Sequence, residues 1–467
     1  MTEKLLASVR NQEKLTFLEE CLLVLLLSIP AIMAQLSSVI MQYIDASMVG
    51  QLGPNDSAAI GLVSSTTWLI FGLITASCIG FHVQIARAIG ANDEKRARNI
   101  MKMGLIITVS LGIVMGVISA FVSPFLPKWL GGHKEIIHNA TMYFLIFAIF
   151  LPFNQLNRTA TGMIQCSGNM KLPSFLNIMM CVLDVILNAL LIFPTRKLWG
   201  LTVPGAGMGV AGAALATGLS QAIIGSIMVY YLCKISSSLK LRKHEALHWD
   251  QGVIKEAMRI AAPVAVNEVV YGSAQMTLTR IISPLGPISL AAHSFAVTAE
   301  SVCYMPGYGI GSASTTLIGQ TIGAKRKDLT IRFAYMATVM GMVFMSVTGI
   351  LMYIFAPVMI GMLSPDAQVC ALGAAVLRIE AVAEPFFAAY IVITGICRGA
   401  GDTFTPSIVE LICMWGIRIP FAMQWAPKAG LSGAWHAMRL QLIATGIILL
   451  IHLYTKRWLR NAHELYS

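Results

Sequence analysis

Long apolar segments alternate with short polar stretches along nearly the whole chain. Each segment is long enough to cross the hydrocarbon core of a bilayer, which takes about 20 residues of α-helix. Twelve such segments are predicted, at residues 18–49, 57–86, 101–126, 135–160, 172–194, 208–233, 253–283, 289–320, 331–359, 367–397, 405–426 and 430–455. Some contain a proline, such as Pro30 and Pro263, and we expect these helices to tilt and kink where neighbouring helices cover the freed carbonyl groups.

The composition supports a membrane protein. Hydrophobic residues make up 56% of the 467 residues and charged residues only 12%, against roughly 25% charged residues in soluble domains. Twelve spans with short connections leave no room for a separate soluble domain. The first apolar stretch follows Lys4, Arg10 and Lys14, but it runs too long for a signal peptide and has no small-residue cleavage site, so we interpret it as the first membrane helix.

The net charge of +11 does not indicate nucleic-acid binding, because the basic residues form no single patch. They fall instead on alternate loops. The loops on the side of both termini carry 24 lysines and arginines, and the opposite loops carry five: Lys128, Lys134, Arg196, Lys197 and Lys428. By the positive-inside rule, both termini should be cytoplasmic. We therefore expect a multi-pass protein of the cell membrane (inner or plasma membrane).

The cysteines and short motifs do not point to an enzyme. Nine cysteines, an odd number, lie mostly inside apolar segments. They form no CxxC pair and have no histidine at metal-ligand spacing, so we expect neither a disulfide framework nor a zinc site. The chain also has no HExxH or GxSxG motif and no clustered His and Asp motif. We therefore predict that it is not an enzyme.

The strongest signal in the sequence is an internal repeat. A shift of 233 residues superposes prolines and glycines of the first half on identical residues of the second. The pairs include Pro30 with Pro263, Gly90 with Gly323, Pro152 with Pro385, Gly168 with Gly401, and Pro173 with Pro406. Later the offset falls to 221, where Gly209 matches Gly430, so the first half has about 12 extra residues around Thr195–Gly205.

The repeat predicts the domain organisation. We expect a six-helix lobe at residues 1–233, a cytoplasmic linker at 234–252 and a second six-helix lobe at 253–467. Six is an even number, so both lobes enter the membrane in the same orientation and are related by an axis along the membrane normal. Repeats of this kind place the substrate path between the lobes, near the middle of the membrane.

Ionisable residues inside predicted spans are the candidates for function, because each is costly to bury in lipid. In the first half these are Asp45 and Asp184. Asn188 lies four residues after Asp184 and so on the same helical face, and Thr217 lies in the next span. A partly desolvated carboxyl in such company could bind and release a proton near neutrality. The structural alternatives are an interfacial cap at Asp45 and a polar clasp between helices at Asp184.

The second half contains more carboxylates. Glu268 and Glu300 fall near the middle of spans that should adjoin, and Glu380 and Glu384 are four residues apart on one predicted face. Clustered carboxylates attract cations or share protons. A structural alternative for Glu380 and Glu384 is an ion pair with the nearby Arg378.

Four further polar residues inside predicted spans have structural interpretations. Glu410 lies near the end of its span, where a capping or snorkelling role is expected. His82, His293 and His436 are isolated in the sequence, and we interpret them as packing histidines with satisfied ring nitrogens.

An ordered set of motifs resembles the multidrug and toxic compound extrusion (MATE) family. The segments that carry the resemblance are Asp45–Gly53, Ala88–Ala91, Gly209–Thr217, Met305–Ala324 and Cys397–Thr403. The resemblance covers nearly the whole chain. The resemblance implies an all-α polytopic membrane protein with twelve transmembrane helices in two pseudo-symmetric six-helix lobes and a V-shaped central cleft. It also implies export of organic cations in exchange for protons or sodium ions.

The resemblance assigns roles to several of these residues. Asp45 matches the first-helix carboxylate of the family, and Thr217 matches a threonine of the amino-terminal cavity. Span five matches the family's Asn and Asp four residues apart, but Asp184 and Asn188 stand in reverse order.

In the second half, Glu268 and Glu300 resemble glutamates of the seventh and eighth helices. The tenth-helix aspartate of some sodium-coupled members is replaced by Phe387, with Glu384 about one turn away. This weakens a sodium site at Glu268, Glu300 and Glu384 without excluding it.

The expected function is therefore a cation-coupled antiporter that exports organic, cationic and amphipathic compounds by alternating access. The coupling ion is a proton or sodium, no other cofactor is expected, and the protein should act as a monomer in the lipid bilayer. An alternative is a flippase or exporter of lipid-linked or other metabolites, as in relatives of the same superfamily. That function would predict a strongly cationic cavity, whereas most of the buried charges here are acidic.

Overall fold

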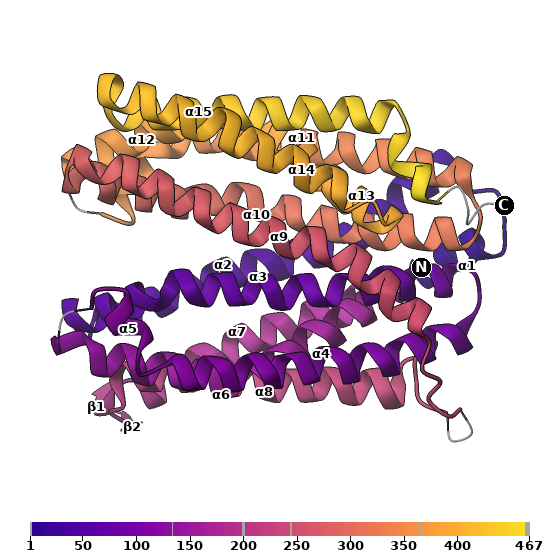
Figure 1. The fold of residues 1–467 in the computed structure, drawn as a ribbon, viewed down its shortest axis with the longest axis horizontal. Helices are drawn as coiled ribbons and strands as arrows, with labels where there is room; N and C mark the ends of the chain where they lie inside the picture. The colour runs from indigo at the N-terminus through magenta and orange to yellow at the C-terminus, as the bar shows by residue number, and fades with distance from the viewer. Residues whose placement is uncertain (1, 133, 199–200, 243–244, 365, 463–467) are drawn as a thin grey trace. The chain divides into compact units, whose positions relative to one another are not determined.

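The computed structural model describes residues 2–132, 134–198, 201–242, 245–364 and 366–462, and helices dominate it (Figure 1). The first half contains α1 (Thr2–Arg10), α2 (Phe17–Gly50), α3 (Pro54–Gly90), α4 (Glu94–Val122), α5 (Leu126–Trp129), α6 (Lys134–Cys166), α7 (Lys171–Leu191), α8 (Gly209–Tyr230) and a π-helical turn, η1 (Tyr231–Ile235). The second half contains α9 (Gln251–Ile282), α10 (Pro287–Gly323), α11 (Lys327–Gly361), α12 (Ala367–Ala381), α13 (Glu384–Ala400), α14 (Phe404–Cys413), α15 (Ile419–Tyr454), the π-helical turn η3 (Met414–Arg418) and the 3₁₀ turns η2 (Ser283–Leu285) and η4 (Arg457–Ala462).

Each of the twelve predicted spans overlaps one or two of these helices. Eight described segments are long and apolar enough to cross a membrane when judged by length and composition alone, and the stretch Phe404–Tyr454 is one of them. This stretch covers two predicted spans, because the helix breaks at Gly430 (φ 62°, ψ −147°). A left-handed φ of this kind is open to glycine and costly for other residues.

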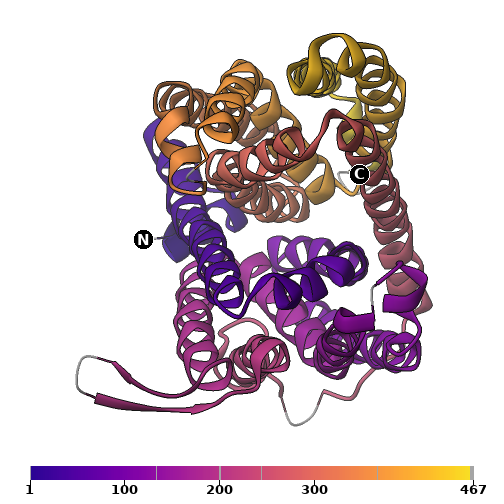
Figure 2. The same ribbon diagram turned by 90° about the vertical axis from the view of Figure 1, so that its left-hand side faces the viewer.

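The extra residues of the first half form a β-hairpin. Strands β1 (Pro194–Leu198) and β2 (Leu201–Ala206) pair antiparallel between α7 and α8, and Figure 2 shows the hairpin extending away from the adjacent helix ends. The drop in repeat offset located this insertion, but the sequence analysis did not predict its strands.

The chain divides into two compact units. The N-terminal unit comprises Ser37–Ile89 and Asp93–Met258, and the C-terminal unit comprises Met1–Leu36, Gly90–Asn92 and Arg259–Ser467. Besides the short pieces 90–92 and 253–258, the units differ from the predicted lobes at two places. The segment up to Leu36 groups with the C-terminal unit, where α1 contacts α10. The linker groups with the N-terminal unit, where Glu245 accepts two 2.7 Å hydrogen bonds from Arg98.

The helices within each unit pack through small residues, as membrane helices commonly do. In the N-terminal unit α6 packs against α4 and α8, and in the C-terminal unit α10 packs against α11 and α13. Gly395 of α13 lies so close to α10 that a Cβ atom there would stand 2.3 Å from the carbonyl oxygen of Gly311. The Thr315 hydroxyl donates to the Gly395 carbonyl across the same contact, at 2.8 Å.

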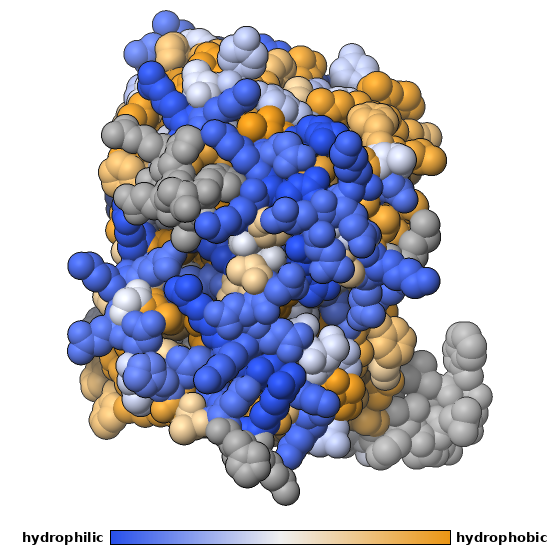
Figure 3. Space-filling view, turned by 90° about the vertical axis from the view of Figure 1, so that its right-hand side faces the viewer, coloured by the Kyte–Doolittle hydropathy of each residue, from blue (hydrophilic) through white to orange (hydrophobic). Residues whose placement is uncertain are grey.

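Basic residues gather at helix ends and connections within each unit. Figure 3 shows that hydrophilic residues cover much of the face that it draws. The exposed basic residues include Lys95 and Arg96 in the first turn of α4 and Lys240 in the N-terminal unit, and Lys325 and Lys327 at the junction of α10 and α11 in the C-terminal unit. These are residues of the basic loop set on which the predicted orientation rests.

Candidate functional site

A cluster of polar side chains joins α2 to α7 inside the N-terminal unit. The side-chain amide of Asn188 donates to Asp45 Oδ1 at 2.8 Å and to Asp184 Oδ2 at 3.1 Å. The two carboxyl groups also lie in hydrogen-bonding contact with each other. Asp184 and Asn188 are fully buried, and Asp45 is half-buried. The one-turn spacing of Asp184 and Asn188 on α7 is what lets one amide reach both acids.

Helix α8 completes this cluster, which we call the N-terminal carboxyl pair. The Ser220 hydroxyl donates to Asp184 Oδ1 at 3.3 Å, and the Thr217 hydroxyl lies within hydrogen-bonding range of the same carboxyl. Two carboxyl groups in contact need a proton between them, because two adjacent negative charges in a low-dielectric site repel strongly. The arrangement can therefore bind and release at least one proton.

A hollow lies beside the carboxyl pair. It has a volume of about 460 Å³, including space open to solvent. Its lining residues are uncharged, and four of the eleven are aromatic: Thr67, Phe71, Tyr143, Phe147, Phe150, Leu151, Asn154, Ala214, Thr217, Gly218 and Gln221. Thr217 belongs both to this lining and to the surroundings of Asp184. Aromatic faces attract organic cations, so the hollow and the carboxyl pair together suit a cationic ligand.

The C-terminal unit contains a second cluster with different properties. Glu300 of α10, Glu380 of α12 and Glu384 of α13 are all buried. Apart from the Cys303 thiol beside Glu384, the oxygens of Glu380 and Glu384 have no hydrogen-bond partner among the described residues. Each of these two glutamates lies within electrostatic range of Glu300. We call this set the C-terminal carboxyl cluster.

The structure corrects two expectations about this cluster. Glu380 and Glu384 do not share one helical face, because α12 ends at Ala381 and α13 begins at Glu384, directly before Pro385. Arg378 does not pair with them either. Its side chain is exposed, donates to the Tyr353 carbonyl at 3.2 Å and lies over the Tyr353 ring.

Arg439 lies within electrostatic range of Glu380, but the buried cation of the cluster is Arg418, which sequence reasoning missed. It is 5% exposed in η3 and lies within electrostatic range of Glu300 and Glu380. Its position inside a predicted span was visible in the sequence, but 38 residues separate it from Glu380 and no local pattern joins them.

Glu268 and Glu410 complete the inventory of acidic residues. Glu268 is half-buried on α9 and lies within electrostatic range of Tyr308. The preceding residue, Asn267, donates to Glu410 Oε2 at 2.7 Å. Glu410 is itself 6% exposed, so the expectation that it caps or snorkels at a helix end was wrong. It is a buried acceptor facing α9.

The histidines behave largely as packing residues. His82 is paired with the Thr159 carbonyl at 3.1 Å, and the Trp435 indole donates to His293 Nδ1 at 3.2 Å. Nδ1 of His436, by contrast, has no partner among the described residues.

The family model described as MatE matches the chain twice, at residues 30–190 and 263–423. The two matches are offset by the same 233 residues as the internal repeat. The chain belongs to the MatE family. Its relatives include a protein named "Probable multidrug resistance protein NorM" from Thermotoga maritima, 24% identical over 93% of this MatE chain and 92% of the relative.

A second relative of this MatE protein is the "Multidrug resistance protein PmpM" of Pseudomonas aeruginosa, 25% identical over 94% of this chain and 92% of the relative. Among solved structures, a "Crystal structure of MATE in complex with MaL6" superposes with a TM-score of 0.86 at 19% identity, covering 93% of this chain and 95% of that one. The MatE chain is thus a polytopic all-α membrane protein with the fold of twelve transmembrane helices in two pseudo-symmetric lobes.

Proposed function

We propose that this MatE protein is a cation-coupled antiporter that exports organic, cationic and amphipathic compounds across the cell membrane. The observation that carries the proposal is the N-terminal carboxyl pair beside an uncharged aromatic hollow. The names of the relatives from Thermotoga maritima and Pseudomonas aeruginosa support multidrug efflux. The acidic cluster and the uncharged lining disfavour an anionic lipid-linked substrate, which would need basic partners.

In the proposed mechanism, the lobes rock to expose the site alternately to each side of the membrane. A proton entering the Asp45–Asp184 contact and an organic cation in the hollow compete, because each neutralises the same carboxyl pair. Glu268 and Glu300 attract the cation or hold a sodium ion. Proton binding from one side then releases the substrate, and departure of the proton to the other side restores the site.

The proposal includes the orientation. Both termini and the linker at 234–252 face the cytoplasm, as the basic loops at that end require. The protein acts as a monomer, since Asp45, Asp184, Asn188 and the hollow belong to one chain.

The test is transport in inverted membrane vesicles. An imposed proton gradient should drive uptake of a fluorescent organic cation, and Asp45→Asn and Asp184→Asn should reduce the uptake to background. The matched control is Asp250→Asn, which changes an exposed aspartate of the linker and should leave uptake unchanged. Uptake driven by proton or sodium gradients in the two aspartate variants would contradict the proposed role of the pair.

A further inference from the structure

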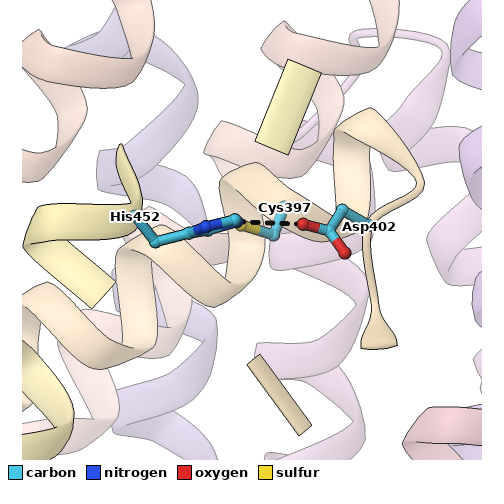
Figure 4. Close-up of side chains that lie close together, drawn as sticks. All are labelled: Cys397, Asp402 and His452. Carbon is cyan, nitrogen blue, oxygen red and sulfur yellow. Dashed lines mark hydrogen bonds and ion pairs between the residues drawn. The ribbon is translucent and has the colours of Figure 1, made fainter. Parts of the chain in front are cut away.

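A second polar cluster of the C-terminal unit lies at the opposite end of α13 from Glu384. Figure 4 shows the side chains of Cys397, Asp402 and His452 pointing toward one another. One ligand-type atom from each (a thiol sulfur, a carboxylate oxygen and an imidazole nitrogen) lies within 4.8 Å of the other two. Asp402 Oδ2 and His452 Nε2 are 3.0 Å apart.

Backbone hydrogen bonds at the end of α13 bring Cys397 and Asp402 together. Helix α13 ends with Gly401 in a left-handed conformation (φ 80°). The amide of Asp402 then donates to the Cys397 carbonyl at 2.8 Å, and that of Gly401 to the Arg398 carbonyl at 2.9 Å. This pair of bonds is a Schellman motif, and it folds Asp402 back beside Cys397.

A further contact orients the carboxylate. Asp402 Oδ1 accepts from the Thr405 hydroxyl at 2.8 Å and from the Thr405 amide at 3.3 Å. Oδ2 is therefore the oxygen directed at His452. Outer contacts that fix a ligand's orientation are characteristic of metal sites.

The repeat supplies a matched comparison inside the same chain. In the first half, Gly168 has the same left-handed conformation (φ 95°), and the Asn169 amide donates to the Ile164 carbonyl. The Asn169 side chain accepts from the Leu172 amide at 3.2 Å and donates to the Tyr231 hydroxyl at 3.2 Å. In the first half, a hydrogen bond between neutral side chains therefore joins the residues after α6 to Tyr231, the first residue of η1.

The repeat offsets relate the two sets residue by residue. Offsets of 233 and 221 match Ile164, Asn169 and Tyr231 to Cys397, Asp402 and His452. The first-half residues show that the helix ends can be joined at this place without a thiol, a carboxylate or an imidazole. The second half nevertheless has all three of these metal-ligand groups together.

We propose that Cys397, Asp402 and His452 bind one Zn²⁺ or a similar divalent transition-metal ion, which joins the end of α13 to the end of α15. Thiolate, imidazole and carboxylate are the ligands that zinc takes in proteins. Zinc bond lengths of about 2.0 to 2.3 Å place tetrahedral ligand atoms roughly 3.3 to 3.8 Å apart. The 3.0 Å between Asp402 Oδ2 and His452 Nε2 would need to widen by only a few tenths of an ångström, and the Cys397 sulfur already lies within 4.8 Å of both atoms.

Binding has a defined proton balance. The Cys397 thiol gives up its proton to solvent, the neutral His452 ring contributes a nitrogen lone pair, and the carboxylate of Asp402 binds as an anion. A water molecule completes the fourth position of a tetrahedral site with three protein ligands.

The experiment measures metal binding to the purified full-length protein in detergent. After equilibration with Zn²⁺ and removal of excess, elemental analysis should give one tightly held ion per chain. With Co²⁺ as the probe, a thiolate-to-metal charge-transfer band should appear. Cys397→Ser should abolish the band and weaken Zn²⁺ binding by at least about 100-fold. Loss of a group that only orients a ligand already lowers metal affinity by about 10- to 100-fold, so loss of a ligand itself should cost at least as much.

Two variants provide the controls. Cys166→Ser changes a buried cysteine at the end of α6 and should keep the band and the affinity. The triple variant Cys397→Ile, Asp402→Asn, His452→Tyr installs the neutral set of the first half; it should fold, and it should bind no ion at this site. Its thermal midpoint should not respond to Zn²⁺, whereas that of the wild type should rise.

Three outcomes would overturn the proposal. One is a wild-type protein that retains no ion under these conditions. Another is equal loss of binding in Cys166→Ser and Cys397→Ser, which would indicate scattered thiol binding. The third is a triple variant with undiminished affinity. Transport of organic cations is not part of these readouts, so the result is independent of the proposed antiport.

Discussion

The two halves of the chain share a backbone plan but place their buried charges at different positions. In the first half, the N-terminal carboxyl pair and its amide occupy α2 and α7. The repeat offset of 233 replaces Asp45, Asp184 and Asn188 by Leu278, Ile417 and Phe421 in the second half. Leu278 belongs to the apolar core there, and Phe421 packs against it.

The reverse exchange occurs at the aromatic hollow. Its lining residues Thr67, Phe147 and Leu151 correspond to Glu300, Glu380 and Glu384 by the same offset. Where the first half has an uncharged hollow, the second half has its carboxyl cluster. The two halves thus share the order of their helices and turns. A position that carries a buried carboxyl group in one half is uncharged at the equivalent position of the other half.

The two clusters also differ in how their charges are satisfied. Asp45 and Asp184 receive donors from Asn188 and Ser220, whereas Glu380 depends on long-range interactions with the buried Arg418 and with Arg439. Buried carboxyls without hydrogen-bond partners are expensive, so we expect the second cluster to be the more sensitive to loss of its cation.

The largest effect should follow Arg418→Met. Removing one partner of a buried charge cluster costs about 3 to 5 kcal/mol, because the remaining carboxyls lose their compensating charge. We expect a fall of this size in the free energy of unfolding in detergent. Adding Glu380→Phe and Glu384→Leu, the residues of the first half, should restore at least half of it. A cost below about 1 kcal/mol for Arg418→Met alone would contradict the assignment of Arg418.

A smaller effect should distinguish two equivalent glycines. A Cβ at Gly395 meets the backbone of Gly311, whereas a Cβ at Gly162 meets the ring of His82. Overpacking costs about 1 to 3 kcal/mol, and a backbone can yield less than a side chain. Gly395→Ala should therefore lower the thermal midpoint more than Gly162→Ala, and the opposite order would show that α13 and α10 can separate easily.

Asn188→Leu should destabilise the protein by about 1 to 2 kcal/mol, because two buried acceptors lose their shared donor. Unfolding at pH 7 measures this cost. The cost should shrink in the variant that also carries Asp184→Ile, the residue of the second half at that position. Equal costs in both backgrounds would mean that the Asn188 amide does not support the carboxyl pair.

The smallest effect concerns two ion pairs, one in the linker before α9 and one in the first turn of α2. Arg98 clamps Glu245 before α9, and Arg332 clamps Glu20 at 2.9 Å near the start of α2. The hydrogen bonds from Arg98 hold the pKa of Glu245 below its ordinary value. In the unfolded chain this carboxyl titrates near about 4.3. The pair therefore stabilises the folded state above that pH.

This contribution should be lost as the pH falls through the lower folded-state pKa. We expect the wild type to exceed Glu245→Gln in free energy of unfolding by about 1 kcal/mol or less at pH 7, and the difference to shrink progressively as the pH falls below about 4.3. Glu13→Gln, an exposed acid near the N-terminus, is the matched control. A difference that does not shrink as the pH falls would mean that the side chain, and not its charge, holds the linker.

Much of the fold could be predicted from the sequence, because a membrane imposes long apolar helices and because a duplication places prolines and glycines at a fixed offset. The α7 part of the site was also accessible, since Asp184 and Asn188 are one helical turn apart.

Contacts between distant segments were not accessible. Arg418 approaches Glu380, and Cys397 approaches His452, only after helices far apart in sequence pack together. The break between Glu380 and Glu384 could have been anticipated from Pro385, because proline has no amide hydrogen to donate to the preceding turn and is favoured in the first turn of a helix. The sheet pairing of Pro194–Ala206 left no apolar periodicity that would have identified it.

The β-hairpin is a suitable place to attach a label. Its two strands pair with each other, and the second half has no counterpart of this inserted segment. A fluorophore or an epitope inserted between β1 and β2 would mark one of the two similar halves of the chain. Such a label would break the ambiguity that duplicated sequences create in single-particle imaging and in distance measurements.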